Sequence, residues 1–271
     1  MIRFSNDGDK ATLKNIWQSG FSDDQNTVDA FFDKGENLFK CLVYADGEKP
    51  VAAKPVAAMY IFDCTLNRGE NGYKSAYLYA LSTLPEYRGK GIMTSLIKYA
   101  EDYLGEKGYD YLFLAPSENS LCKYYEKLGF LPCDMKKCAD IPADCIFDMP
   151  TETKALSATE LHGLRESSFS DYVRFDKDVL GFMLDFGEAE AISFDGGWAV
   201  VDGDGETIRV IEFCGEINRT LSAVKSRYKS KKYRVYLENG ALMGEAVCRG
   251  MLKPLCNKAA QNDIHIGLIM D

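Results

Sequence analysis

The fold of this chain is decided by residues 81–94, whose sequence is Leu81-Ser82-Thr83-Leu84-Pro85-Glu86-Tyr87-Arg88-Gly89-Lys90-Gly91-Ile92-Met93-Thr94. An apolar run typical of a strand precedes this stretch, and from Gly91 onwards apolar residues recur at helical spacing. A strand that turns through glycines into a helix gathers free backbone N–H groups at one point, where the helix dipole favours an anion. The stretch therefore predicts a site for a phosphate-bearing ligand, and a glycine-rich turn without a ligand is the alternative.

The same stretch excludes two common nucleotide-binding motifs. The P-loop pattern G-x-x-x-x-G-K-[ST] and the dinucleotide pattern G-x-G-x-x-G are both absent. Downstream, residues 111–115 form a short, continuously apolar run, as expected of a strand covered on both faces. A second helix follows, which carries Tyr124 and Tyr125 and for which Gly129 is a suitable cap.

Together these segments resemble the GNAT superfamily of N-acetyltransferases. Residues 81–93 are similar to the acetyl-CoA motif of that superfamily, and residues 124–130, with the sequence YYEKLGF, are similar to its downstream motif. Arg88 and Gly91 match the family pattern Q/R-x-x-G-x-G/A, whose last small position is Met93 here. The resemblance covers roughly residues 1–135. It implies an α/β fold with a GNAT-type mixed sheet flanked by helices.

The resemblance also implies acetyl-CoA as cosubstrate, with no metal. The backbone of Leu81 and Thr83 is expected to pair with the pantetheine arm as if the arm were another strand. The residues expected to contact the cofactor are Leu81, Ser82, Thr83, Arg88, Gly89, Lys90, Gly91, Ile92, Met93, Thr94 and Asn119.

The resemblance places Tyr125 as the acid that protonates the departing CoA thiolate, because a phenol can supply a proton without being ionised at rest. Adjacent helical residues point about 100° apart, so Tyr124 is the alternative and both cannot face one sulfur. A general base is not evident, since Tyr77 stands where some relatives carry a glutamate. Cys122 lies on the same helix as a conceivable nucleophile, but a buried inert thiol is the better interpretation.

The chain ends on an unusually apolar segment, residues 264–270. Such a segment is expected to be a buried strand that packs back towards the first half of the chain. This arrangement would bring Asp271 to the cleft as the missing base. A plain strand with an exposed terminus is the alternative.

Residues 1–145 are expected to form the acetyl-CoA-binding catalytic domain. The pattern weakens over residues 139–153, where Pro142 and Pro150 occur, and this marks a domain boundary. The expected strands are residues 2–4, 41–45, 56–66, 73–84 and 111–115, and the expected helices are residues 9–19, 24–34, a segment from residue 92 to about 104, and 121–128.

Residues 150–271 are expected to form a second, accessory α+β domain. Its predicted strands are residues 189–193, 198–201, 207–213 and 233–237, and its predicted helix is residues 217–228. This order repeats that of the first half, which indicates a degenerate GNAT-like duplicate. No Arg-x-x-Gly motif occurs after residue 150, so this half is not expected to bind CoA in the same manner. The order of the halves and the chain end partly resemble the longer, multidomain acetyltransferases of the enhanced-intracellular-survival type.

Composition narrows the function further. The formal charge of −9 argues against a broad nucleic-acid surface and is compatible with an amine substrate. The chain has only two histidines, and its nine cysteines are scattered, which leaves little material for a histidine triad or a metal site. The start has no secretory pattern, and no apolar run approaches the roughly 20 residues of a membrane helix, so a cytoplasmic protein with reduced thiols is expected.

The function predicted from the sequence is transfer of an acetyl group from acetyl-CoA to a primary amine of a small molecule or peptide. Asp23 and Asp24 either face that amine or cap a helix, and the cap is the commoner use. The alternative function is a CoA-binding sensor or interaction module without transfer activity. The identity of the acceptor does not follow from the sequence.

Overall fold

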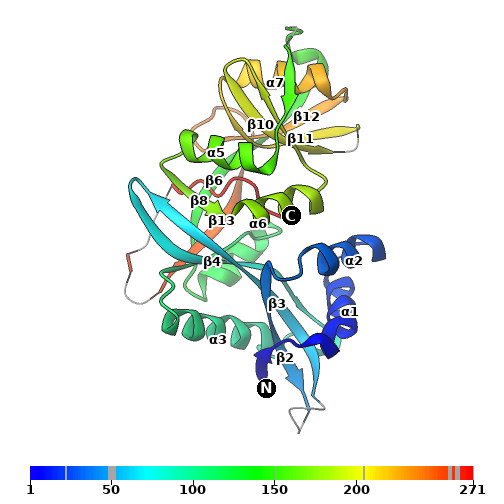
Figure 1. The fold of residues 1–271 in the computed structure, drawn as a ribbon, viewed down its shortest axis with the longest axis vertical. Coiled ribbons are helices and arrows are strands. Elements are labelled where there is room, and N and C mark those ends of the chain that lie inside the picture. The colour runs from blue at the N-terminus through cyan, green and yellow to red at the C-terminus, as the bar shows by residue number, and fades with distance from the viewer. Residues whose placement is uncertain are drawn as a thin grey trace.

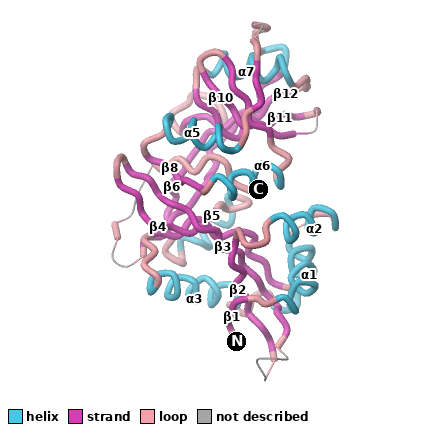
Figure 2. Tube along the Cα trace, viewed as in Figure 1, coloured by secondary structure: helices cyan, strands magenta, loops and turns pink. Residues whose placement is uncertain are grey.

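The computed structural model describes residues 1–21, 23–47, 53–149, 151–203, 205–255, 258–259 and 263–270. Its 13-stranded sheet has the strand order β1-β2-β3-β4-β5-β13-β6-β12-β11-β10-β9-β7, and β8 pairs with β3 outside this path. Figure 1 shows an elongated molecule in which the second half of the chain stands above the first. Figure 2 shows strands along its whole length, with helices packed beside them. The predicted mixed sheet flanked by helices is therefore confirmed.

The first half contains six strands and four α-helices among its described residues. The strands are β1 (Ile2–Phe4), β2 (Phe39–Asp46), β3 (Lys54–Arg68), β4 (Asn71–Thr83), β5 (Tyr111–Leu114) and β6 (Leu131–Pro142). The helices are α1 (Lys10–Gly20), α2 (Gln25–Lys34), α3 (Ile92–Glu106) and α4 (Cys122–Glu126). Most of these elements lie within a few residues of their predicted positions, but β6 was not predicted.

Two buried clusters cover the two faces of this half. Trp17 of α1 and Phe31 of α2 pack on Tyr60 and Tyr79 from one face. Leu96 and the other apolar residues of α3 pack on the opposite face, together with Tyr125. Figure 1 accordingly shows α1 and α2 on one side of the sheet and α3 on the other.

The second half follows the order of elements of the first with two departures. Its strands are β7 (Thr153–Ala155), β8 (Asp171–Phe175), β9 (Glu190–Phe194), β10 (Gly197–Gly203), β11 (Thr207–Cys214), β12 (Lys232–Glu238) and β13 (Glu245–Pro254). Its helices are α5 (Ala158–Ser168), α6 (Lys177–Phe186) and α7 (Ile217–Arg227). The departures are that strand β8 lies between α5 and α6, and that no helix among the described residues stands between β12 and β13. The parallel pair β11 and β12, joined through α7, corresponds to the parallel pair β4 and β5, joined through α3.

Strand β13 lies between β5 and β6 and pairs antiparallel with both. The sheet of the first half is thus completed by a strand from late in the chain. The pairing of β13 with β5 and β6, together with that of β12 with β6, joins the two halves into one continuous sheet. The division at residues 145 and 150 remains a prediction.

The end of the chain is buried, as predicted, but it is not a regular strand. Among residues 263–270 only His265 forms a β-bridge, which is to Tyr172. Ile264, Ile266 and Met270 are each buried.

Candidate functional site

Strands β4 and β5 separate at the middle of the first-half sheet. Their parallel pairing covers only Ser75 to Tyr77 on β4 and Tyr111 to Phe113 on β5. Beyond Tyr77, β4 continues to Thr83 with β3 on one side and, among the described residues, no strand on the other. This unpaired edge can accept an extended ligand by backbone hydrogen bonding.

A bulge interrupts β4 along this open edge. Ala58 of β3 faces Ser82 and Tyr60 faces Tyr79, so the two residues 80 and 81 stand opposite Met59 alone. Ala80 has a φ of 48°, in the left-handed region that costs a non-glycine residue free energy. Bulges of this kind re-aim backbone groups and are frequent beside active sites.

The predicted phosphate turn follows directly. Gly89 and Gly91 have φ angles of 74° and 73°, and a Cβ at either position would meet nothing within 4 Å. Glycine is therefore required by backbone conformation and not by lack of space. Gly91 is the N-cap of α3 and supplies no side-chain hydrogen bond, so the N–H groups of the first turn remain available to a ligand.

The corresponding helix of the second half is closed. At the start of α7, the Glu216 carboxylate accepts hydrogen bonds from the N–H groups of Asn218 and Arg219 at 3.1 and 2.9 Å. The carboxylate thus occupies the place that an anionic ligand would take. This contrast supports the prediction that the second half does not bind CoA in the manner of the first.

Arg88 organises the turn itself. Its Nε donates to the Thr83 carbonyl at 2.9 Å, and its second terminal nitrogen donates to the Ser19 carbonyl at 2.8 Å. The guanidinium therefore fixes the end of β4 against the end of α1. Lys90 lies with Nζ 4.7 Å from the centre of the Tyr87 ring and keeps a second cation at the turn.

Several predicted cofactor residues have side chains that bond or pack within the protein. Ser82 is buried, and its hydroxyl donates to the Ile16 carbonyl at 3.0 Å. Met93 is partly buried and packs against the apolar cluster beneath α3. The amide group of Asn119 bonds to the backbone of β13 through both its nitrogen and its oxygen, at 3.2 Å each. For Ser82, the backbone therefore remains as the candidate contact with the cofactor.

The two tyrosines of α4 have different surroundings. Tyr124 is half-buried, and its hydroxyl lies 3.1 Å from Thr94 Oγ1 in the first turn of α3. Tyr125 is 8% exposed and packs edge-on against Phe130. Among the described residues none forms a hydrogen bond with the Tyr125 hydroxyl. Burial, with a smaller effect of neighbouring Tyr124, raises the pKa of Tyr125 to about 12, so the phenol is neutral at physiological pH.

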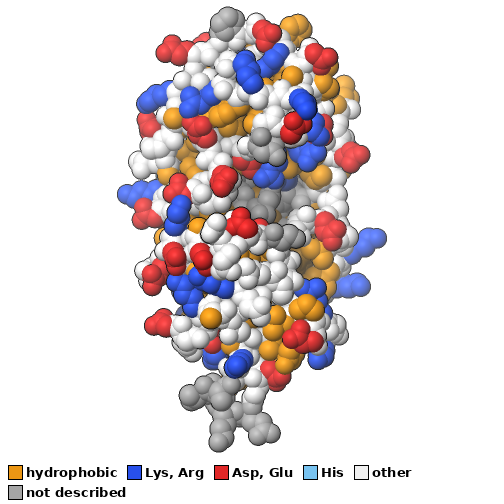
Figure 3. All heavy atoms as spheres, turned by 90° about the vertical axis from the view of Figure 1, so that its right-hand side faces the viewer, with side chains coloured by type: hydrophobic (Ala, Val, Ile, Leu, Met, Phe, Trp, Pro, Cys, Tyr) orange, Lys and Arg blue, Asp and Glu red, His pale blue; other side chains and the backbone are white. Residues whose placement is uncertain are grey.

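A cavity of ≈ 310 Å³ lies between the two halves. It is lined by Asp23, Thr27, Met183, Phe186, Gly187, Glu188, Ala189, Asp202, Arg209, Ile211, Leu268, Ile269 and Met270. Three carboxylates and one guanidinium are among these residues, and Arg209 already pairs with Asp202. Figure 3, which views the side that carries α2 and the chain end, shows the surface hollowed at mid-height with charged side chains around it.

The cavity is connected to the bulged strand through a row of aromatic rings. The ring centres of Phe186, on the cavity wall, and Trp17 lie 6.2 Å apart. The ring centres of Trp17 and Tyr79, the residue before Ala80, lie 5.7 Å apart. The Trp17 indole donates to Asp23 at 2.7 Å, which fixes that carboxylate at the cavity. Asp24, by contrast, caps α2 by accepting from the Thr27 N–H at 2.9 Å.

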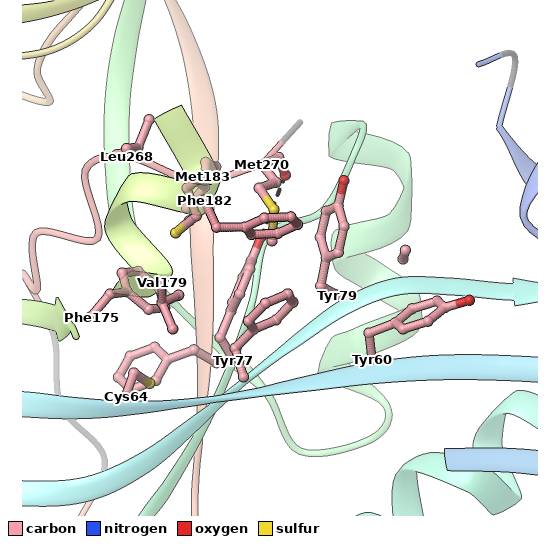
Figure 4. Packing of buried hydrophobic residues seen from close by; sticks show 14 of the residues in the cluster. Tyr60, Cys64, Tyr77, Tyr79, Phe175, Val179, Phe182, Met183, Leu268 and Met270 are labelled. Atoms are coloured by element: carbon pink, nitrogen blue, oxygen red, sulfur yellow. Dashed lines mark hydrogen bonds between the residues drawn. The ribbon is translucent and has the colours of Figure 1, made fainter. Parts of the chain in front are cut away.

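The chain end forms the remaining wall. The Tyr77 hydroxyl donates to the Met270 carbonyl at 3.5 Å, so the end does reach the first half of the chain. Figure 4 shows Met270 and Leu268 beside Phe182 and Met183 of α6, above the ring of Tyr77. Asp271, the predicted base, lies outside the described residues. Sequence reasoning did not predict the contribution of α6, since nothing in its apolar pattern indicates a distant partner.

The described ranges lack two kinds of feature, a metal-binding cluster and a membrane-spanning helix. Within them, no group of three or more His, Cys, Asp or Glu side chains is placed to hold a metal ion. No helix among them is both long and apolar enough to cross a bilayer. Eight cysteines of these ranges are free thiols, and Cys122 is half-buried.

Comparison with known sequence families gives a match, which covers the first half of the chain. Residues 1–133 match the family described as the acetyltransferase (GNAT) domain. This match confirms the resemblance on which the sequence prediction rests. No curated protein matches the chain in sequence.

Solved structures extend the similarity of fold to almost the whole chain. A probable N-acyltransferase from Enterococcus faecalis V583 superposes with a TM-score of 0.74 at 12% identity, over 94% of this chain and 72% of that one. Eis1 from Mycobacterium abscessus gives 0.67 at 11% identity, over 94% and 73%. A putative acetyltransferase from Pyrococcus horikoshii gives 0.63 at 15% identity, over 99% and 94%. At these identities the likeness shows the fold, including that of the second half.

Proposed function

Because the chain contains a GNAT acetyltransferase domain over residues 1–133 and is an acyltransferase, we propose that it transfers an acetyl group from acetyl-CoA to a primary amine of a small molecule or peptide. One observation carries the proposal. An unpaired strand edge runs into a helix start whose N–H groups are uncapped, and the two lie end to end at residues 78–94.

The two parts of this feature fit the two parts of CoA. The pantetheine arm carries amide groups, which suit the open edge of β4 at Leu81 and Thr83. The pyrophosphate suits the N–H groups of residues 91–94, with Lys90 nearby as a counter-charge. The thioester would then lie at the gap between β4 and β5, near the bulge at Ala80.

The cavity between the halves is the proposed acceptor site. Asp23 and Glu188 give it carboxylates besides the Asp202 paired with Arg209, and such a lining favours a cationic amine. The aromatic wall at Phe186 would cover the apolar part of the acceptor. A cavity of ≈ 310 Å³ accommodates a small amine or the end of a peptide.

The reaction needs positioning more than nucleophilic machinery. The amine, once deprotonated, attacks the carbonyl carbon, the carbon–sulfur bond breaks, and the thiolate takes a proton. Backbone N–H groups beside the bulge would stabilise the negative charge on the carbonyl oxygen. Tyr125 is the proposed proton donor, because it is neutral and its hydroxyl is not used by the described protein, whereas Tyr124 is bonded to Thr94.

The test is CoA release from acetyl-CoA with a panel of polyamines, aminoglycosides and peptides, together with mass analysis of the acceptor. Turnover on at least one amine supports the proposal. Saturable CoA binding without turnover on any amine would favour the sensor instead. A cytoplasmic location follows from the proposal, because acetyl-CoA is supplied there.

A further inference from the structure

A buried charge cluster holds the chain end where it lines the acceptor cavity. Its centre is Glu212 of β11, whose side chain is fully buried. Glu212 Oε1 accepts from Arg165 Nε at 3.0 Å and lies 2.6 Å from His265 Nε2, and Oε2 accepts from the Leu268 N–H at 3.2 Å. One carboxylate therefore joins α5 and β11 to two points of the chain end.

Arg165 adds a second set of bonds to the same segment. Its terminal nitrogen donates to the Ile266 carbonyl at 3.0 Å and to the Val173 carbonyl at 3.3 Å. Arg165 is 2% exposed, so its charge has no solvent to stabilise it and depends on Glu212. Loss of the Glu212 charge would therefore weaken the bonds that Glu212 and Arg165 both make to this segment.

The first half contributes to the same anchor. Asp134 of β6, also buried, accepts from the Ile266 N–H at 3.1 Å. From the second half, Arg249 of β13 donates to the Gly267 carbonyl at 3.5 Å. Charged side chains thus form hydrogen bonds with consecutive peptide groups between residues 265 and 268. Bonds of this kind are stronger than neutral ones, which explains how a segment without regular pairing is held in place.

The held segment leads directly to the proposed acceptor site. Leu268, Ile269 and Met270 form one wall of the ≈ 310 Å³ cavity, and the Met270 carbonyl accepts from Tyr77. Figure 4 shows Leu268 and Met270 of this wall, with Met270 above the ring of Tyr77. The shape of the cavity therefore depends on where residues 265–268 are fixed.

We propose that Glu212 is a positioning residue for acetyl transfer, which acts by anchoring the chain end as a wall of the acceptor cavity. The inference rests on the proposed function for its role in transfer, but the anchoring itself does not. It assigns the second half a direct share in the acceptor site. The cofactor site around Gly91 lies outside this anchor, so the two sites respond differently to a change at Glu212.

The experiment compares wild type with Glu212→Gln, which keeps the size of the side chain but removes its charge. Exposure of the chain end is measured by the rate at which a carboxypeptidase releases the last residues, and CoA affinity by calorimetry. We expect at least tenfold faster release, an acceptor KM raised at least tenfold, and a CoA Kd within twofold of wild type.

The matched control is Asp9→Asn. Asp9 is a buried carboxylate that pairs with Arg3 at 2.6 Å in the first half, far in sequence from the chain end. Its loss should destabilise the protein without releasing the chain end or raising the acceptor KM. If Glu212→Gln does not fold, the variant Glu212→Gln with Arg165→Met removes the uncompensated charge, and His265→Gln removes one bond only.

The outcomes separate this inference from the proposed function. A wild-type protein that turns over no amine contradicts the proposed function, while the release rates still decide the anchoring. A chain end equally protected in wild type and in the foldable Glu212 variant overturns the inference. So does a rise in acceptor KM that Asp9→Asn reproduces.

Discussion

The hydroxyl of Tyr124 lies 3.1 Å from Thr94 Oγ1 and so ties the tyrosine-bearing helix α4 to the first turn of α3. The turn that would bind pyrophosphate and the helix that would deliver a proton are therefore held in fixed relation. Its neighbour Tyr125, without such a bond, is left as the proposed proton donor. The two adjacent tyrosines thus have separable roles.

Replacement of Tyr125 by Phe should lower kcat by roughly 10²–10⁴ with CoA affinity nearly unchanged, because it removes the proposed proton donor but no bond within the described protein. Tyr124→Phe should instead weaken CoA binding slightly and leave most of the turnover. Steady-state kinetics and calorimetry on the pair measure both effects. Equal, small losses at the two positions would mean that solvent protonates the thiolate.

Replacement of Gly91 by Val should abolish CoA binding, because a β-branched residue cannot readily adopt its φ of 73° at the helix start. Gly108→Val is the control, since Gly108 has a φ of 75° and equally open surroundings at the far end of α3. Both variants should lose about 1–2 kcal/mol of stability from backbone strain. Only the first should lose CoA affinity, and unchanged affinity in it would refute the placement of the cofactor.

Asp23→Asn should raise the KM for a cationic amine by roughly 3–10-fold, as loss of one carboxylate at a partly solvated site costs about 1 kcal/mol. Asp24→Asn should change neither KM nor stability appreciably, because asparagine caps a helix about as well as aspartate. An uncharged acceptor analogue should not distinguish Asp23→Asn from wild type. A KM effect shared by both variants would show general field effects and not a contact at the cavity.

Acid should destabilise the protein through Glu212. Burial alone would raise its pKa, but the charge of Arg165 and the bond to His265 outweigh burial and lower the pKa from 4.5 to about 2. A lowered pKa stabilises the fold above about pH 4.5, and this contribution, about 3 kcal/mol, is lost as pH falls towards 2. Urea unfolding of wild type between those pH values should show the loss, and a folded Glu212→Gln variant should show a smaller pH dependence.

The sequence predicted the elements whose patterns are local. The apolar runs at residues 56–66 and 73–84 and the helical spacing after Gly91 appear as β3, β4 and α3. Strand β6 was not predicted because it carries Asp134 and Lys136, and such charged residues are typical of a surface segment. In the structure both are buried and pair with each other, and Lys136 also reaches Glu238 of β12.

The candidate site, too, could be predicted from the sequence only in part. The backbone conformation at Gly89 and Gly91 follows from the motif, because only glycine commonly adopts it. The cavity does not, since Asp23, Phe186 and Met270 come from three distant parts of the chain. Nor does the use of Asn119 and Arg88 in protein contacts, which depends on where β13 and α1 pack.

The place of β13 has a consequence for synthesis. Residues 1–142 leave the ribosome with β5 and β6 lacking the strand that separates them, since β13 begins only at Glu245. The first half cannot complete its sheet until more than a hundred further residues have been translated, so its nascent form carries exposed strand edges that favour aggregation. A gene cut at the apparent boundary near residue 145 should yield insoluble protein. Supplying residues 245–254 on a short linker after β6 should restore solubility, so the useful place to divide this gene is around the inserted segment 143–244.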